Sequence, residues 1–384
     1  MHITFILDDF GGGGKERRCL QLIQGLNRKG YNDIQVILLK NLVQYPELYQ
    51  TTSQLHIIDR KAQHISVVAA AKMIHALLQD FKPDIVQAWG KVSAACALLN
   101  KPFMKFKFIC SYVADCDKPP VWRSKFYVNL LCKRMCDKVV GNSAKGLKVY
   151  GIPSKKAVLI YNGINEKRQE SVIDVNWKKK EMNITTPFVV AMIAVFRKDK
   201  DWDCFLDTAK AIIKQRSDIT FLAVGSGDMW EKYNNSVTEE YRPLLKILGR
   251  RDDTDEILQI CDLTVLSSHH GEGISNSIME SMAFGVPVIA TNSGGTPEII
   301  SDGIDGVLMP RNDVEWLRKM INNLIDNQEM RIELGVAAKK KIKEHFTLSR
   351  MTKKYIELYS SLLKINEFSF PNDSFMQSLI DRKK

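Results

Sequence analysis

Residues 267–298 read SSHHGEGISNSIMESMAFGVPVIATNSGGTPE and give the clearest indication of how this chain folds. The apolar run Leu263–Leu266 just before them predicts a short buried strand. Gly271 and Gly273 permit a sharp turn, and apolar residues then recur at helical spacing until Gly285 ends the helix. A second apolar run follows at once. The stretch therefore predicts strand, tight loop, helix and strand, the unit from which parallel α/β sheets are built.

Two glutamates stand out in this unit, Glu272 in the loop and Glu280 in the helix, with seven residues between them. We expect Glu280 to lie two turns into the helix, on the same side as Glu272, with the free amides of residues 274–277 between them. Unpaired amides at a helix N-terminus attract anions, and carboxylates accept hydrogen bonds from hydroxyl groups. The arrangement predicts a ligand that carries both phosphate and sugar hydroxyls, such as a nucleotide sugar.

The run from Leu263 to Glu298 resembles the donor-site signature of the family-4 retaining glycosyltransferases. That family has the GT-B fold, in which two Rossmann-like α/β domains face each other across a cleft. The resemblance implies that Glu280 holds the donor ribose, whereas Glu272 and the backbone after it hold the transferred sugar and the distal phosphate. That backbone comprises Gly273, Ile274, Ser275 and Asn276. Two glutamates at this spacing could also be solvated surface charges, but a match over about thirty residues is far more specific.

The length of 384 residues favours two domains of roughly 150–200 residues each. Residues 1–165 alternate predicted strands and helices, and so do residues 166–345, as in two Rossmann-like domains. The segment from Asn162 to Pro187 loses this periodicity and becomes polar. We interpret it as the connection between an acceptor-side domain and a nucleotide-sugar-binding domain. The family resemblance implies that a last helix, near residues 346–364, returns to the first domain.

A glycine-rich turn, Gly11–Gly14, separates the first predicted strand from the first helix. Such turns bring backbone amides close to phosphate in several folds, so the pattern is weak by itself. A nicotinamide-dependent oxidoreductase is the rival interpretation, but it requires an acidic residue after the second strand, where this chain has Lys40. In the glycosyltransferase family this turn faces the donor phosphates, which implies that role for Gly13 and Gly14.

Basic residues follow the first predicted strand of the second half, in the segment from Arg197 to Lys200. Cations at a strand end that faces a cleft can neutralise a departing diphosphate without a metal ion, and we predict that task for Lys200 and Arg197. The resemblance also implies that Gly225 contributes backbone contacts and that Arg250 lines the nucleobase pocket. We therefore expect no metal ion and no cofactor, the nucleotide sugar being a co-substrate.

The acceptor side carries fewer indications. Many relatives place a histidine near the end of a first-domain strand, but no histidine lies between His75 and His269 in this chain. Asp115, with Asp117, is the nearest group that could orient an acceptor hydroxyl, and a solvated loop is an equal alternative. The predicted catalytic groups are therefore Glu272, Lys200, Arg197 and Asp115.

Positive charge is concentrated in the first half of the chain. The net charge is +11, and residues 1–165 carry 24 basic and 11 acidic side chains. Residues 101–148 alone hold 11 basic and 3 acidic ones, interleaved with aromatic residues. Such a surface suits anionic lipids, lipid diphosphates or nucleic acid. We expect reversible attachment to an anionic membrane surface through exposed basic residues, the candidates being Lys118, Arg123, Lys125, Lys133 and Arg134.

The sequence also bounds where the protein works. No apolar run reaches the roughly 18 residues that span a bilayer, and Ile3–Leu7 is followed by acidic residues where a secretory signal would stay apolar. The eight cysteines form no C-x-x-C pair, which favours reduced thiols. We therefore expect a cytoplasmic protein that lies peripherally on the inner face of the plasma membrane.

Together these features predict a metal-independent retaining hexosyltransferase. Its expected acceptor is a hydroxyl group on a glycan or lipid-linked glycan of capsule, exopolysaccharide or lipopolysaccharide assembly, and a UDP-sugar is the favoured donor. The alternatives left open are a GDP-mannose-dependent mannosyltransferase and a nucleotide-sugar-binding protein of the same fold without turnover. No nucleic-acid-binding motif is present in the sequence, so nucleic acid is not an expected partner.

Overall fold

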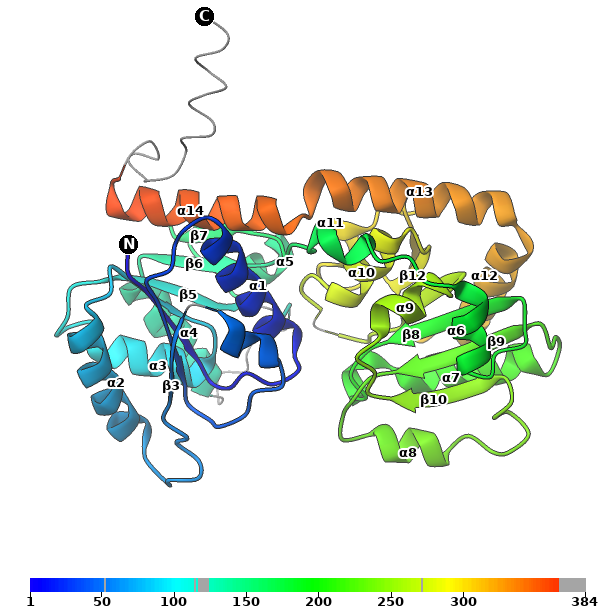
Figure 1. Cartoon of the computed structure of the whole chain (residues 1–384), viewed down its shortest axis with the longest axis horizontal. Helices are drawn as coiled ribbons and strands as arrows, with labels where there is room; N and C mark the ends of the chain where they lie inside the picture. The colour runs from blue at the N-terminus through cyan, green and yellow to red at the C-terminus, as the bar shows by residue number, and fades with distance from the viewer. Residues whose placement is uncertain (52, 114, 117–123, 271, 366–384) are drawn as a thin grey trace, which may run out of the picture.

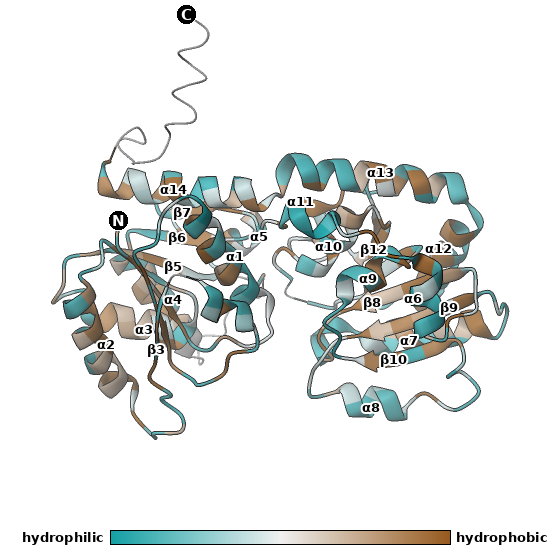
Figure 2. Ribbon diagram, in the orientation of Figure 1, coloured by the Kyte–Doolittle hydropathy of each residue, from teal (hydrophilic) through white to brown (hydrophobic). Residues whose placement is uncertain are grey.

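The computed structural model describes residues 1–51, 53–113, 115–116, 124–270 and 272–365. In this part of the chain two α/β units lie side by side, each built on one parallel sheet with helices around it (Figure 1). The strands at the centre of each unit are largely hydrophobic, whereas an outer helix such as α8 (Trp230–Asn235) is hydrophilic (Figure 2). Strands of parallel sheets are covered on both faces, so near-continuous apolar runs are what such strands require.

The first unit has a seven-stranded sheet in the order β3-β2-β1-β4-β5-β6-β7, with every neighbouring pair parallel. Its strands are β1 (Ile3–Leu7), β2 (Ile34–Leu38), β3 (Gln54–Ile57), β4 (Ile85–Ala88), β5 (Lys107–Val113), β6 (Lys138–Gly141) and β7 (Ala157–Leu159). β1 is buried along its whole length. It is an interior strand of the sheet, between β2 and β4, and the turn that follows it lies at the carboxyl edge.

The helices of the first unit are α1 (Gly14–Arg28), α2 (Val67–Phe81), α3 (Lys91–Asn100), α4 (Ser124–Met135) and α5 (Ala144–Val149), with a 3-10 turn η1 (Pro46–Gln50). Two of them begin at a serine that caps the helix, because the hydroxyl accepts a hydrogen bond from an amide of the first turn. Ser66 caps α2 in this way and Ser143 caps α5. The Ser143 cap fixes the chain just after β6.

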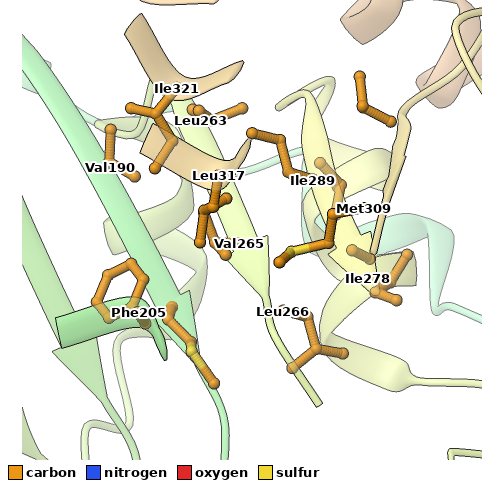
Figure 3. Packing of buried hydrophobic residues seen from close by; sticks show 14 of the residues in the cluster. Val190, Phe205, Leu263, Val265, Leu266, Ile278, Ile289, Met309, Leu317 and Ile321 are labelled. Carbon is orange, nitrogen blue, oxygen red and sulfur yellow. The ribbon is translucent and has the colours of Figure 1, made fainter. Parts of the chain in front are cut away.

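The second unit has a six-stranded parallel sheet in the order β10-β9-β8-β11-β12-β13. Its strands are β8 (Phe188–Ile193), β9 (Ile219–Val224), β10 (Leu245–Gly249), β11 (Leu263–Leu266), β12 (Val288–Thr291) and β13 (Val307–Met309). On one face, Val190, Leu263 and Val265 from the strands lie with Leu317 and Ile321 in one buried cluster (Figure 3).

The remaining helices are α6 (Val175–Glu181), α7 (Trp202–Ile213), α8, α9 (Thr254–Gln259), α10 (Asn276–Phe284), α11 (Thr296–Ile299), α12 (Val314–Asp326) and α13 (Gln328–His345), with 3-10 turns η2 (Glu166–Gln169) and η3 (Lys198–Lys200). The segment 162–187, which we interpreted from the sequence as the connection between the domains, contains η2 and α6. Asp174 accepts hydrogen bonds from the amides of Asn176 and Trp177 and so caps α6. A helix of seven residues is too short to show an apolar period.

The last helix, α14 (Leu348–Leu363), packs against α1 of the first unit. α13 and α14 run end to end along one side of the molecule and span both units (Figure 1). Where the chain crosses back, Ile164 exchanges backbone hydrogen bonds with Phe346 and Leu348, both 2.8 Å long. The two crossing segments are thus paired with each other. Among the described residues, no helix is both long and apolar enough to cross a membrane.

Candidate active site

A cleft of about 1060 Å³ lies between the two units. The first unit lines it with residues that follow β1, β2, β5, β6 and β7, and the second unit with residues that follow β8, β9, β10 and β11. Ligands of open parallel sheets bind at the carboxyl ends of the strands. The residues predicted from the sequence that line this cleft are Gly13, Gly14, Asp115, Arg197, Lys200, Gly225, Arg250, Glu272, Ile274, Ser275, Asn276 and Glu280.

Gly273 is the predicted donor-site residue that does not line the cleft. It faces the Gly294–Gly295 turn instead, where a Cβ on Gly295 would lie 2.5 Å from the Gly273 carbonyl oxygen. A Cβ on Gly294, whose φ is +57°, would lie 2.0 Å from the carbonyl oxygen of Glu272. Both glycines are therefore required for the close approach that holds the Glu272 loop in place.

Helix α10 begins at Asn276, later than expected. Ser275 at its N-cap keeps an extended conformation, so Glu280 lies just over one turn into the helix and not two. The Ser275 hydroxyl lies 3.1 Å from the Ser277 hydroxyl rather than on a helix amide. The first amides of α10 are therefore left to the cleft, as an anion-binding helix terminus requires.

Glu280 is 5% exposed and is held by two arginines. Its Oε1 atom accepts a hydrogen bond of 2.8 Å from Nη1 of Arg168 and forms an ion pair with Arg17, whose Nη1 also lies at 2.8 Å. Burial by itself would raise the pKa of Glu280, but the two guanidinium groups hold that pKa below the ordinary value of a carboxyl group. Arg17 comes from α1 and Glu280 from α10, so this ion pair joins the two units across the cleft.

Glu272 forms a second ion pair inside the cleft, with the ammonium of Lys200. Its Oε1 also accepts a hydrogen bond of 3.1 Å from the hydroxyl of Ser268. Burial lowers the pKa of Lys200 to about 8, and the nearby Asp199 carboxylate opposes that shift. The two predicted donor carboxylates are thus both paired with cations of the site itself.

Arg197 lies at the rim of the cleft, where its side chain is 58% exposed and makes two hydrogen bonds to Asp199, at 2.9 and 2.7 Å. Asp201, two residues further on, accepts a hydrogen bond from the amide of Cys204 and lies 3.1 Å from His269. Both aspartates of this turn therefore already have partners. The guanidinium of Arg197 is therefore occupied by Asp199 in this structure.

The glycine turn of the first unit faces the start of α10. The Asn276 side chain donates a hydrogen bond of 3.4 Å to the carbonyl oxygen of Gly14, and the Tyr45 hydroxyl donates one of 3.5 Å to that of Gly13. A Cβ on Gly14 would lie 3.2 Å from Asn276. The turn and α10 thus approach each other from opposite walls of the cleft.

Gly225 and Arg250 line the cleft from the second unit. Gly225 has a φ of +155°, and a Cβ there would lie 1.8 Å from the carbonyl oxygen of Ala194, so only glycine fits. Arg250 is half-exposed and contacts Asp252 at 3.3 Å. These positions suit the backbone and nucleobase roles that the family resemblance implies for them.

On the acceptor side, Asp115 forms an isolated antiparallel bridge with Glu272, which brings the two units together at this point. Its Oδ1 accepts a hydrogen bond of 2.7 Å from the hydroxyl of Tyr150. Asp115 is therefore a fixed residue beside Glu272 and not a solvated loop residue. Asp117 lies outside the described residues.

Sequence reasoning missed three charged residues: Arg17 and Glu298, which join the two units, and Arg168, which pairs with Glu280 from the connecting segment. Glu298 accepts hydrogen bonds from the amides of Ala144 and Lys145, at 2.8 and 2.9 Å, and so caps α5 of the other unit. Arg17 directly follows the Gly-Gly-Lys-Glu turn, which was the available indication. Nothing around Arg168 in the sequence distinguishes it from other charged residues of the connection.

Among the described residues, one acidic group has metal-ligand spacing: Glu181, Asp253 and Glu256. The ammonium of Lys178 lies 2.7, 2.5 and 2.7 Å from these three carboxylates. Lys178 is 3% exposed and occupies the position that a cation would take. The group therefore acts as a structural ion-pair cluster that anchors α6 to the segment around α9.

Two family models match the chain: residues 12–168 match "Glycosyltransferase Family 4" and residues 174–341 match "Glycosyl transferases group 1". The chain is 31% identical over 182 residues to an uncharacterized glycosyltransferase of Methanocaldococcus jannaschii, with 47% of each chain aligned. It is 26% identical over 249 residues to the UDP-Gal:alpha-D-GlcNAc-diphosphoundecaprenol alpha-1,3-galactosyltransferase of Escherichia coli, with 63% of this chain and 62% of that protein aligned. The chain spans about half the length of the curated relatives it matches.

The fold is similar to that of Anabaena HepE, whose crystal structure was solved in complex with UDP. The TM-score is 0.81 at 19% sequence identity, and the match covers 94% of this chain and 100% of HepE. This likeness confirms the expected GT-B architecture of two facing Rossmann-like units.

Proposed function

The chain belongs to the group 1, family-4 glycosyltransferases, and we propose that it moves a hexose from a nucleoside diphosphate sugar to a hydroxyl acceptor. One observation carries the proposal: the cleft between the two units places Glu272 and Glu280 on either side of the open N-terminus of α10, with Lys200 beside them. Carboxylates accept hydrogen bonds from sugar hydroxyls, while the helix terminus and the ammonium attract phosphate.

In this proposal the donor diphosphate competes with Glu272 for Lys200. A phosphate at the start of α10 draws the ammonium toward itself, and the Glu272 carboxylate becomes free to accept hydrogen bonds from the hexose. Glu280 keeps its two arginines and uses its remaining acceptor capacity for the ribose hydroxyls, since an ionised carboxylate offers about four acceptor sites. The positive charge of Arg17 then lies between ribose and diphosphate.

The leaving diphosphate is stabilised by fixed charges, so no metal ion is required in this mechanism. The dipole of α10 and Lys200 face the charge that develops as the glycosidic bond breaks, and Arg197 adds to them once it leaves Asp199. Among the described carboxylates at this part of the cleft, Glu272 and Glu280 are assigned to the sugar and the ribose, and Asp115 is assigned to the acceptor. We therefore favour retention by attack of the acceptor on the face from which the diphosphate departs.

A UDP-sugar is the proposed donor, by analogy with the E. coli relative, whose name specifies UDP-Gal, and with HepE, which was crystallised with UDP. The name of the same E. coli relative specifies a diphosphoundecaprenol-linked acceptor. We propose a lipid-linked glycan acceptor for this chain as well, bound in the first unit where Asp115 meets Glu272. Assembly of a surface polysaccharide or lipopolysaccharide is the corresponding role.

A lipid-linked acceptor requires that the enzyme reach a membrane, and α4 offers a surface for this. Tyr127, Leu130 and Leu131 on α4 are 58%, 44% and 47% exposed, and Arg134 beside them is exposed. Apolar side chains next to basic ones are typical of elements that lie in an anionic membrane surface. We propose peripheral attachment to the inner face of the plasma membrane through α4, with the enzyme in the cytoplasm.

The rest of the basic segment 101–148 does not add to this surface in the described part of the chain. Phe106 and Phe108 are buried in the core of the first unit. Lys118 and Arg123 lie outside the described residues, as does the side chain of Lys125, and Lys133 is half-buried. The proposed surface is therefore narrower than the basic segment 101–148.

Calorimetric titration with UDP, GDP and their hexose conjugates tests the proposed function. We expect UDP-sugars to bind and GDP-sugars to bind more weakly, and we expect transfer to a polyprenyl-diphosphate-linked N-acetylhexosamine with the anomeric configuration retained in the product. Absence of binding to every nucleotide tried would refute the proposal. A product with inverted anomeric configuration would support the proposed glycosyl transfer but would exclude the retaining mechanism.

A further inference from the structure

Two asparagines on the first-unit wall of the cleft have side-chain oxygens without a partner in the described part of the chain. They are Asn142, directly after β6, and Asn162, three residues after β7. The two side chains are 4% and 3% exposed, and both residues line the cleft. A buried carboxamide oxygen that lacks a hydrogen bond destabilises the fold by about 1–3 kcal/mol, so its position requires an explanation.

The location of these oxygens is set by the sheet. β6 and β7 are parallel neighbours, with Gly141 opposite Leu159, so both asparagines emerge at the same carboxyl edge. The amide of Asn142 donates to the carbonyl oxygen of Val113 at 3.4 Å, which places Asn142 beside the Asp115–Glu272 bridge. The proposed function puts the transferred hexose on the Glu272 side of this bridge and the acceptor on the Asp115 side.

Asn162 lies further along the same wall, against the start of α10. Its amide nitrogen donates to the side-chain oxygen of Asn276 at 2.8 Å and to the carbonyl oxygen of Ile274 at 3.3 Å. The side-chain nitrogen of Asn162 thus bonds to the second unit, whereas its side-chain oxygen has no hydrogen-bond partner among the described residues. The two unpartnered oxygens both belong to a neutral group that accepts hydrogen bonds from hydroxyls without attracting phosphate.

We propose that Asn142 and Asn162 form a subsite on the first unit whose side-chain oxygens accept hydrogen bonds from the hydroxyl groups of the donor hexose. The inference rests on the proposed function and adds substrate-binding residues to it. In this proposal Glu272 binds the hexose from the second unit, and the two carboxamides bind it from the first unit. All of these hydrogen bonds to the sugar form only when the two units face each other. UDP without a sugar leaves both oxygens without a partner.

Asn142→Leu is the variant that tests the subsite, because leucine has a similar volume. Among the described residues, the Asn162 side chain bonds to the second unit and the Asn142 side chain does not. The probes are UDP and four conjugates: UDP-glucose, UDP-galactose, UDP-N-acetylglucosamine and UDP-N-acetylgalactosamine. We expect Asn142→Leu to bind UDP as the wild type does. Its affinity for the conjugate that the wild type prefers should fall roughly three- to ten-fold, as loss of one neutral hydrogen bond predicts.

The matched control is Asn100→Leu. Asn100 is also 3% exposed in the first unit, but its side chain is fully used, by His75 and by the carbonyl oxygens of Ala71 and Cys96. We expect the control to lower the melting temperature and to leave both affinities unchanged. Asn142→Leu should keep or raise the melting temperature, since it removes an unpartnered buried polar group.

The outcomes separate the inference from the proposed function. If the wild type binds none of the nucleotides, the proposed function fails and the subsite falls with it. If the wild type binds a conjugate more tightly than UDP and Asn142→Leu preserves that difference, the proposed function stands and the subsite is refuted. Equal loss of UDP and conjugate affinity would also refute it, because the effect would then not concern the sugar.

Discussion

Glu280→Gln is the most informative perturbation of the donor site, because Glu280 is both the proposed ribose ligand and the partner of two arginines. Glutamine keeps the shape of the side chain and removes its charge. A hydrogen bond to a charged group contributes about 1.5–3 kcal/mol, and each 1.4 kcal/mol corresponds to a tenfold change in affinity. We therefore expect UDP to bind roughly 10- to 100-fold more weakly to the variant, as measured by calorimetric titration.

The same change should lower stability. In the variant, Arg17 and Arg168 face a neutral group, although Arg168 keeps Asp255 and the Arg17 side chain is 28% exposed. Breaking a fully buried ion pair costs about 3–5 kcal/mol, and these remaining partners and this exposure reduce the expected loss to about 1–3 kcal/mol. Because a change of 1 kcal/mol shifts the melting temperature by roughly 2–4 °C in units of this size, the shift is measurable by calorimetry.

The pH dependence of stability supplies an independent check. The pKa of Glu280 is held below its ordinary value of 4.5, so its ion pairs stabilise the folded state fully above that pH and progressively less as the pH falls through the lowered pKa. The wild type should thus lose this contribution in acid, whereas Glu280→Gln lacks it at every pH. The two melting temperatures should converge as the pH falls.

Asp255→Asn is the matched control, since Asp255 also pairs with Arg168 but does not line the cleft. It should lower the melting temperature and leave UDP affinity unchanged. Equal UDP affinity in the wild type and in Glu280→Gln would refute the ribose assignment. If Asp255→Asn loses as much UDP affinity as Glu280→Gln, the loss of affinity is caused by the disturbed Arg168 and not by a lost hydrogen bond to the ribose.

Three further predictions concern charge. Because the pKa of Lys200 is lowered to about 8, the affinity for UDP should fall as the pH rises through that value. In Lys200→Arg the affinity should stay constant over this range, and parallel curves of UDP affinity against pH for the two proteins would contradict the assignment. Transfer should survive EDTA, and activity that returns only on addition of magnesium or manganese would contradict the fixed-charge account of the leaving group. The protein should sediment with anionic vesicles but not with neutral ones, and Arg134→Glu should weaken that binding by roughly fivefold or more, because one basic residue contributes about 1 kcal/mol; equal binding to both vesicle types would exclude α4 as an anionic-membrane surface.

The sequence by itself determined many of the elements and predicted which two carboxylates hold the donor. Short apolar runs predicted β1 and β11, and Gly285 predicted the end of α10, where φ is +76°. These features depend on residues close together in the chain, whose backbone preferences and spacing act locally. The fold class followed from their alternation and from the match over residues 263–298.

Only the tertiary structure decided what surrounds those carboxylates. Arg17 reaches Glu280 from the other unit, and Asp115 meets the Glu272 loop at the edge of the sheet where β5 and β6 both end and where Asn142 bonds to Val113. Such contacts join residues far apart in the chain, and they depend on how two sheets face each other and on which side chains remain unpaired after packing. Local periodicity contains no information on either of these. The sequence therefore predicted the two carboxylates of the donor site, whereas the structure alone showed the arginines that pair with Glu280 and the carboxamides on the other wall of the cleft.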